Sequence, residues 1–265
     1  MTDRQPVVSV SGVTKVFQGS GGSRVQALDN INLDVHPGDF VSLLGPSGCG
    51  KSTLLRLIGD LIAPSAGTVL VNGKPAHQAR LDRDYGMVFQ QATLYDWRTV
   101  TQNVQLPLEV MNVPRARREA RTQEMLRLVQ LEEFARHYPW QLSGGMQQRV
   151  SIARALSFEP TLLLMDEPFG ALDEMTRERM QTEVLRIWSQ TKTTVVFVTH
   201  SIPEAVFLSS RVVVMSARPG RVSGVIEIDL PRPRTVETRE HPRFFEKLTE
   251  VRECLRHDEV KVASA

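Results

Sequence analysis

Residues 45–53 form a glycine-rich loop that limits the folds open to this chain. The loop consists of Gly45, Pro46, Ser47, Gly48, Cys49, Gly50, Lys51, Ser52 and Thr53. A short apolar run over 40–44 precedes it, and leucines and isoleucine at helical spacing follow over 52–60. This strand, loop and helix match the phosphate-binding pattern G-x-x-x-x-G-K-[ST] in the context that the pattern requires. An ordinary glycine-rich turn would leave the lysine and the hydroxyl unexplained.

The residue types in this loop suit a polyphosphate. Glycines let backbone N–H groups turn toward phosphates, and the start of the following helix adds the positive end of its dipole. In such loops a lysine in the position of Lys51 reaches the β- and γ-phosphates, and a hydroxyl in the position of Ser52 ligates Mg²⁺. The loop therefore predicts a nucleotide site.

A second motif is an apolar strand over 162–165 that ends in two carboxylates, Asp166 and Glu167. A carboxylate at a strand end can meet Mg²⁺ near the phosphates, and its neighbour can polarise a water for in-line attack on the γ-phosphate. We assign the metal to Asp166 and the water to Glu167. Taken alone, such a pair is also typical of a solvated corner or a helix cap.

A third motif, Leu-Ser-Gly-Gly-Met-Gln-Gln-Arg over 142–149, opens a helix rich in Ala, Ile and Leu. Ser143 suits the N-cap position, and Gly144 and Gly145 allow a close backbone approach. The free N–H groups of such a helix start form an anion site. A well-capped helix without a ligand is the alternative.

The remaining patterns indicate an α/β fold. Two half-buried strands are expected at 7–13 and 25–35, with a Gly-Ser run over 19–23 between them, and a helical region extends over 101–156. Strands at 162–165 and 195–199 bracket a helix over 174–190, and a strand, a turn at 219–220 and another strand follow 211. We expect one domain over 1–240, with a helical subdomain at about 95–157 inserted, and a C-terminal helix and tail over 241–265.

Composition narrows the function classes. The 265 residues include 32 basic and 30 acidic ones, and a formal charge of +2 is too balanced for a chain that mainly grips a nucleic acid. Cys49 and Cys254 have no pairing or metal-ligand spacing, which favours a reducing compartment. The longest apolar runs are strand-sized, so we expect the chain neither to cross nor to enter a membrane.

Five motifs occur in the order and approximate spacing of the ABC ATPase family: the phosphate loop, residues 142–147, Asp166-Glu167, Ala171-Leu172-Asp173 and Val198-Thr199-His200. Over about 7–230 the chain resembles that family. The resemblance implies a P-loop ABC ATPase with a RecA-like parallel-sheet core, an antiparallel β subdomain and an inserted helical subdomain. It also implies ATP and Mg²⁺ as ligands, and a head-to-tail dimer in which each ATP lies between one subunit's loop and the other's helix that follows Ser143.

The resemblance also implies roles for single residues. Phe17 would stack on adenine, although the family more often has a tyrosine there. Gln90 would sense Mg²⁺ and the attacking water, His200 would contact the γ-phosphate, and Asp173 would organise the dimer seam. From the residues alone, Gln90 reads as a polar strand-end residue and His200 as a helix cap.

A finer resemblance is to importer ATPases of the nitrate, sulfonate and taurine group, carried by residues 94–100, 166–173, 217–221 and 229–234. It implies transmembrane permease subunits, a second ATPase subunit and, through the permease, a periplasmic or lipid-anchored binding protein. The chain would then lie on the cytoplasmic face of the membrane and help to import a small solute. We expect 94–100 to line the cleft that receives a permease helix; the alternative buries Trp97 in the core of the helical lobe.

Other classes fit less well. A soluble ABC-type ATPase that acts on ribosomes or DNA typically has two cassettes or a long coiled-coil insertion, and a small-molecule kinase leaves Ser143 and His200 unexplained. The arginines at 115, 117, 118 and 121 read as a solvated helix face. The final helix is expected to pack on its own domain rather than on the second subunit.

Overall fold

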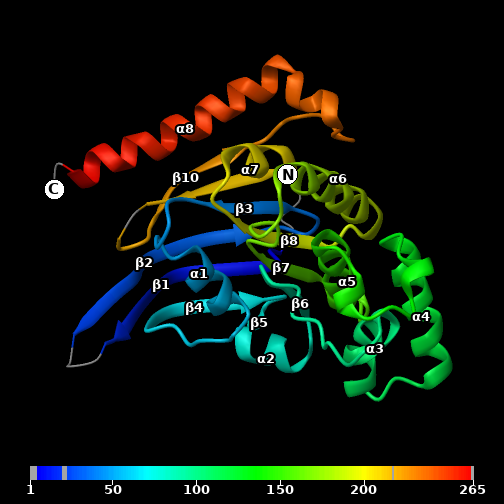
Figure 1. The fold of residues 1–265 in the computed structure, drawn as a ribbon. Helices are drawn as coiled ribbons and strands as arrows, with labels where there is room; N and C mark the ends of the chain where they lie inside the picture. The colour runs from blue at the N-terminus through cyan, green and yellow to red at the C-terminus, as the bar shows by residue number, and fades with distance from the viewer. Residues whose placement is uncertain (1–4, 20–22, 217, 264–265) are drawn as a thin grey trace. The chain divides into compact units, whose positions relative to one another are not determined.

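The computed structural model describes residues 5–19, 23–216 and 218–263, with side chains as far as 256 (Figure 1). The chain forms two compact units. Unit 1 combines Met1–Tyr85 with Thr193–Ala265, and unit 2 is Gly86–Lys192. Of the expected features, Ala217 and residues 20–22 of the Gly-Ser run lie outside the described residues.

An antiparallel sheet forms the first layer of unit 1. Its strands, in spatial order, are β2 (Arg24–Val35), β1 (Val8–Gln18), β4 (Ala66–Val71) and β5 (Lys74–Pro75). Val8 lies opposite Val35 on one side and Val71 on the other. Alternate residues of β1 and β2 are buried, because a half-buried strand turns every second side chain to the core. The predicted strand pair is therefore confirmed, whereas the pattern had not singled out β4 and β5.

The second layer of unit 1 is built around β3 (Phe40–Leu44), all of whose residues are buried. The strand order is β10-β9-β3-β8, in which β3 runs parallel to both neighbours. The other strands are β8 (Thr194–Thr199), β9 (Arg211–Met215) and β10 (Val222–Glu227), and the helices of this unit include α1 (Lys51–Ile58), α2 (Ala76–Leu81) and α7 (Ile202–Leu208). A fully buried β3, apolar except for Ser42, suits a parallel strand covered on both faces. The expected parallel core is thus confirmed.

A long helix, α8 (Pro242–Ala263), follows the short helix η4 (Val236–Glu240). It packs on α7, β9 and β10, and buries Phe244 and Val251 against them. These two side chains cover unit 1 itself, whereas Phe245 is exposed. Lys247 and Arg243 pair with Asp229 at the start of the helix.

Unit 2 holds the helical region. It contains the helices α3 (Val100–Val110), α4 (Arg115–Leu128), α5 (Gly144–Leu156) and α6 (Glu174–Thr191), with short helices η2 (Glu132–Phe134) and η3 (Pro139–Gln141). It also contains β7 (Leu162–Asp166) and all but the first residue of the neighbouring strand β6 (Tyr85–Val88). Thr99 is the N-cap of α3, and its side chain accepts from the Gln102 N–H in a capping box. Arg115 and Arg117 are exposed as expected, but Arg121 is largely buried because it donates to the last carbonyls of α5, Leu156 O and Ser157 O.

No helix in the described part of the chain is long and apolar enough to span a membrane.

The Pro-Arg-Pro-Arg stretch over 231–234 ties the end of α7 to the segment that follows β10. Arg234 is only 4% exposed, and its Nη1 donates to the carbonyls of Val206, Phe207 and Ser209. Its Nη2 donates to Ile228 O and Leu230 O. The last carbonyls of a helix lack intrahelical partners and carry the negative end of the dipole, so a buried cation suits this place. Burial, helped by Arg232, lowers the pKa of Arg234 to about 9.

We predict that Arg234→Met lowers the free energy of unfolding by about 3 kcal/mol, because the buried carbonyls lose a charged donor. Urea unfolding measures this loss. Arg117→Met, on the exposed face of α4, serves as the control and should change stability by less than about 0.5 kcal/mol. Equal effects of the two substitutions would contradict the structural role of Arg234.

Candidate nucleotide site

The glycine-rich loop of unit 1 joins the end of β3 to the start of α1. Gly50 caps α1 with φ 98°, and a Cβ there would lie 2.5 Å from Leu28 Cδ2. Gly48 also has a positive φ of 77°. Both residues use backbone that favours glycine, and such turns aim successive N–H groups into one concavity that suits an anion.

Lys51 lies against this loop. Its side chain is buried, and Nζ donates to Gly45 O at 2.8 Å and Pro46 O at 3.0 Å. The ammonium group thus carries its charge where the loop closes on itself. Burial raises the pKa of the neighbouring Cys49 thiol, although Lys51 opposes this shift. Cys49 is therefore a neutral packing residue in the loop.

His200 leaves the same edge of the sheet as the loop. Leu44 of β3 and Thr199 of β8 are partners in a parallel register, so Gly45 and His200 follow directly from neighbouring strand ends. His200 is exposed, and α7 begins next to it with Ser201 as its N-cap. The structure therefore brings together the loop and the histidine that the sequence singled out 150 residues apart, counting from Gly50 to His200.

Phe17 lies near the end of β1, opposite Val25, and is 40% exposed. The ammonium of Lys15 lies 5.0 Å from its ring centroid. Phe17 thus offers an aromatic surface that a flat ligand could stack on.

In unit 2, the two predicted carboxylates fall at the end of β7. Asp166 is its last residue, and both carboxylates are partly buried. Glu167 has φ 45°, and the N–H of Gly170 donates to its carbonyl at 3.0 Å. A glutamate in this left-handed backbone region is uncommon and costs conformational energy.

Gln90 lies beside this turn. A Cβ on Gly170 would come within 2.8 Å of Gln90 Nε2. Strands β6 and β7, which precede Gln90 and Glu167 in the chain, are neighbours in the sheet. The structure thus groups Gln90 with the turn that carries Glu167.

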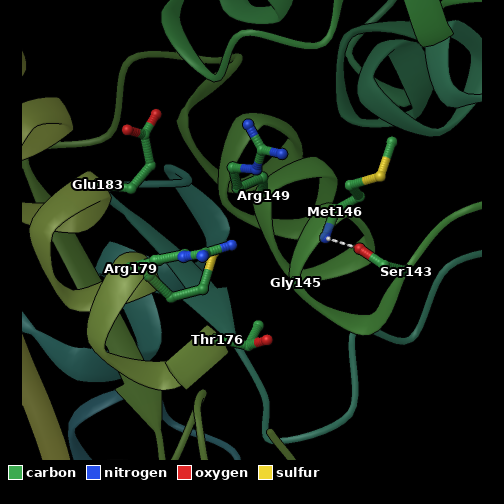
Figure 2. A pocket seen from close by; sticks show the side chains of 8 residues that line it. Ser143, Gly145, Met146, Arg149, Thr176, Arg179 and Glu183 are labelled. Atoms are coloured by element: carbon green, nitrogen blue, oxygen red, sulfur yellow. Dashed lines mark hydrogen bonds between the residues drawn. The ribbon is translucent and has the colours of Figure 1, made fainter. Parts of the chain in front are cut away.

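Ser143 caps α5 as predicted, because its hydroxyl accepts from the Met146 N–H at 3.3 Å (Figure 2). The start of α6 lies nearby, since a Cβ on Gly145 would lie 3.1 Å from Thr176 Cγ2. Asp173 caps α6 by accepting from Thr176 N–H, and hydrogen bonding by Thr176 lowers the pKa of Asp173. A cavity of about 290 Å³ opens between the helices; its lining includes Arg149 and Arg179.

Two residues to which the sequence analysis gave no role of their own tie α5 to the segment around Gln90. Gln148 is buried and donates to Phe89 O at 2.9 Å. Arg154 donates to Ala92 O and Thr93 O, and burial lowers its pKa. Gln148 shares the buried face of α5 with Ile152, so a polar residue at an apolar helical position was the available signal.

Trp97 lies on the surface and not in the core of the lobe. It is 72% exposed, and its ring centroid lies 4.8 Å from that of Tyr95. The buried Asn103 fixes this segment by donating to Tyr95 O, Arg98 O and Thr99 O. The alternative of a buried tryptophan is therefore wrong.

The donor types of the proposed metal residues fit Mg²⁺. Ser52, Gln90 and Asp166 offer oxygen ligands, which this ion prefers, and Mg²⁺ with a nucleotide needs only one or two protein carboxylates. No group of three or more His, Cys, Asp or Glu that could hold a metal gathers among the described residues.

Comparisons with known proteins extend these observations. A family model described as ABC transporter matches residues 28–170. An uncharacterized ABC transporter ATP-binding protein of Methanocaldococcus jannaschii is 50% identical over 250 residues, 94% of this chain and 92% of the relative. The taurine import ATP-binding protein TauB of Rhizobium johnstonii is 46% identical over 259 residues, 96% and 98% of the two chains.

Solved structures agree with the fold. A dimeric ABC transporter cassette matches with a TM-score of 0.72 and 38% identity, covering 83% of this chain and 98% of its own. The same cassette has been solved after hydrolysis, with ADP and Pi. The cbiO1 protein of Clostridium perfringens, part of the transporter complex cbiONQ, matches with a TM-score of 0.77 and 25% identity over 93% and 96% of the chains.

We predict that Glu167→Gly unfolds at a higher denaturant concentration than Glu167→Ala, by about 1 kcal/mol in free energy. Both variants lack the carboxylate, but only alanine keeps the Cβ that the positive φ disfavours. The opposite order is expected at an ordinary position such as Glu119 in α4, where alanine is the better residue. If alanine were also the better residue at 167, Glu167 would not be strained.

Proposed function

The chain belongs to the ABC transporter family as one of its ATPase subunits, and from this membership we propose that it drives the import of a small solute of the nitrate, sulfonate or taurine type. The observation that carries this proposal is that similarity to a taurine import protein extends over almost the whole chain. It includes residues 217–234, which lie beyond the region matched by the family model.

We propose that the loop of unit 1 holds the phosphates of ATP. Backbone N–H groups of the loop 45–53, to which Pro46 contributes none, would surround the β-phosphate. Lys51 would exchange its two carbonyl acceptors for phosphate oxygens. His200, at the neighbouring strand end, would contact the γ-phosphate. Phe17 would stack on the adenine, which needs only an aromatic face and no hydroxyl.

The chemical step would be attack of water on the γ-phosphorus, in line with the oxygen that leaves with ADP. Glu167 would accept a proton from that water, and Gln90, beside the same turn, would orient it. Ser52, Asp166 and Gln90 would hold Mg²⁺, which when bound neutralises charge on the phosphate oxygens. Catalysis would come mainly from positioning and charge stabilisation.

We propose that two copies close head to tail on two nucleotides. Ser143, Gly144 and Gly145 would present the start of α5 to the γ-phosphate held by the partner, because a helix start attracts anions. Asp173 caps α6 next to this surface, and would form part of the seam. Closure on ATP and reopening after hydrolysis would supply the motion for transport.

The motion would pass to transmembrane permease subunits at the cytoplasmic face of the membrane. The exposed pair of Tyr95 and Trp97 supports this, because single exposed aromatics are ordinary but a held aromatic pair suits an interface. Gln148 and Arg154 connect this segment to α5. A periplasmic or lipid-anchored binding protein would deliver the solute to the permease.

We predict that Glu167→Gln lowers ATP turnover at least about 100-fold and accumulates an ATP-bound dimer, because the water loses its base while the phosphates stay bound.

Lys51→Ala should weaken ATP binding about tenfold or more, because a charged donor to the phosphates is lost. Turnover assays, size-exclusion chromatography and calorimetry measure these effects.

Glu119→Gln, on the exposed face of α4, is the matched control and should keep the turnover of the original chain. If Glu167→Gln kept the ATP turnover of the original chain, Glu167 would not be the base that accepts the proton from water.

The proposed transport role is tested by purifying the tagged chain from detergent-solubilised membranes of its own cell. We expect a multi-span membrane protein and a binding protein to accompany it. Trp97→Ala should reduce recovery of the membrane partner, whereas Val236→Ala, at a single exposed apolar side chain, should not. Recovery with ribosomes or DNA-repair proteins instead would favour a soluble ABC-type ATPase. Unchanged assembly and transport in Trp97→Ala would exclude residues 94–100 as the docking surface.

A further inference from the structure

A turn between β9 and β10 packs directly on the phosphate loop. A Cβ on Gly220 would lie 2.0 Å from Cys49 O, and a Cβ on Gly45 would lie 2.5 Å from Met215 O. Two backbones that approach so closely leave no room for any side chain at these positions. The turn is therefore part of the wall of the loop.

Hydrogen bonds fix this turn to β2. Gly220 N–H donates to Ala27 O at 2.9 Å, and Asp29 N–H donates to Gly220 O at 2.9 Å. Arg221 pairs with Asp29, and its N–H donates to the Ser216 hydroxyl. The turn thus holds its place relative to the loop without any ligand.

Arg218 projects from this anchored turn beside the loop. Its Nη2 lies 3.2 Å from the position of a Cβ on Gly48, and its Nε lies 3.6 Å from that point. The side chain is exposed, and no carboxylate among the described residues pairs with it, in contrast to Arg221. A guanidinium group with free donors thus stands at the rim of a concavity of backbone N–H groups.

We propose that Arg218 is a further nucleotide-binding residue, which donates to phosphate oxygens of the nucleotide in the loop. The inference rests on the proposed nucleotide site. Arginine presents several donors in a rigid fork that matches phosphate geometry, whereas Lys51 supplies a point charge. Lys51 belongs to the loop motif, whereas Arg218 lies far from it in the sequence and comes close to it only in the fold.

The test measures binding of ADP and of adenosine to the full chain by calorimetry. ADP is chosen because it carries the phosphates but does not require the partner's α5. Arg218→Ala should raise the Kd for ADP about tenfold, as expected for one charge-assisted contact, and leave the Kd for adenosine unchanged. The Kd of Arg218→Lys for ADP should lie between those of the original chain and of Arg218→Ala. Arg117→Ala, an exposed arginine of α4, should match the original chain.

Salt and folding separate this role from simple packing. The difference in Kd between the original chain and Arg218→Ala should narrow as KCl is raised, because salt screens an exposed charge. Thermal unfolding without nucleotide should be unaffected, and Arg218→Gln, which keeps most of the side-chain volume, should also weaken ADP binding.

The outcomes distinguish the inference from its premise. If Lys51→Ala loses ADP binding while Arg218→Ala and Arg218→Gln keep it, the inference about Arg218 fails and the proposed site stands. If neither Lys51 nor Arg218 matters for ADP, the proposed nucleotide site itself is wrong.

Discussion

The parallel register around β3 is the constraint on which unit 1 depends. Because β3, β8 and β9 run in the same direction, their carboxyl ends meet at one edge of the sheet. The phosphate loop, His200 and the turn with Arg218 each follow one of these ends. Gly220 and Cys49, which are 171 positions apart in the chain, therefore meet backbone to backbone, and the Arg218 side chain comes close to Gly48.

In unit 2, helix α5 has a comparable organising role. Its N-terminal end presents Ser143 and two glycines, and its buried face sends Gln148 and Arg154 to the backbone that follows Gln90. Hydrogen bonds from a buried side chain to backbone carbonyls hold an irregular segment in one shape at modest net gain, but breaking them is costly. One rigid helix thus joins the proposed anion surface to the segment that carries Trp97.

The sequence predicted those parts of the molecule whose residue types answer to one local demand. Gly48 and Gly50 allow a positive φ, Ser143 caps a helix, and residues 40–44 form a strand buried on both faces. The turn at 219–220 was expected, but its contact with Cys49 was not, because it depends on the register of β9 against β3. The buried positions of Arg121, Arg154 and Arg234 were not predicted for a related reason. An arginine in a sequence is normally expected at the surface, and the carbonyls that these three bind come together only in the folded chain.

Backbone strain sets Glu167 and Thr93 apart from the other non-glycine residues with positive φ. Among the described non-glycine residues with positive φ, most are Asn or Asp in turns or lie just after a helix, as Gln130, Glu159 and Lys192 do. Those places tolerate the conformation or gain a helix cap from it. Glu167 and Thr93 meet neither condition: they are not Asn or Asp, and they do not follow a helix. Thr93 is also β-branched, and Glu167 follows the strand β7. Glycine or asparagine would fold more easily at 167, so the carboxylate is better explained by the chemistry of the site than by the turn.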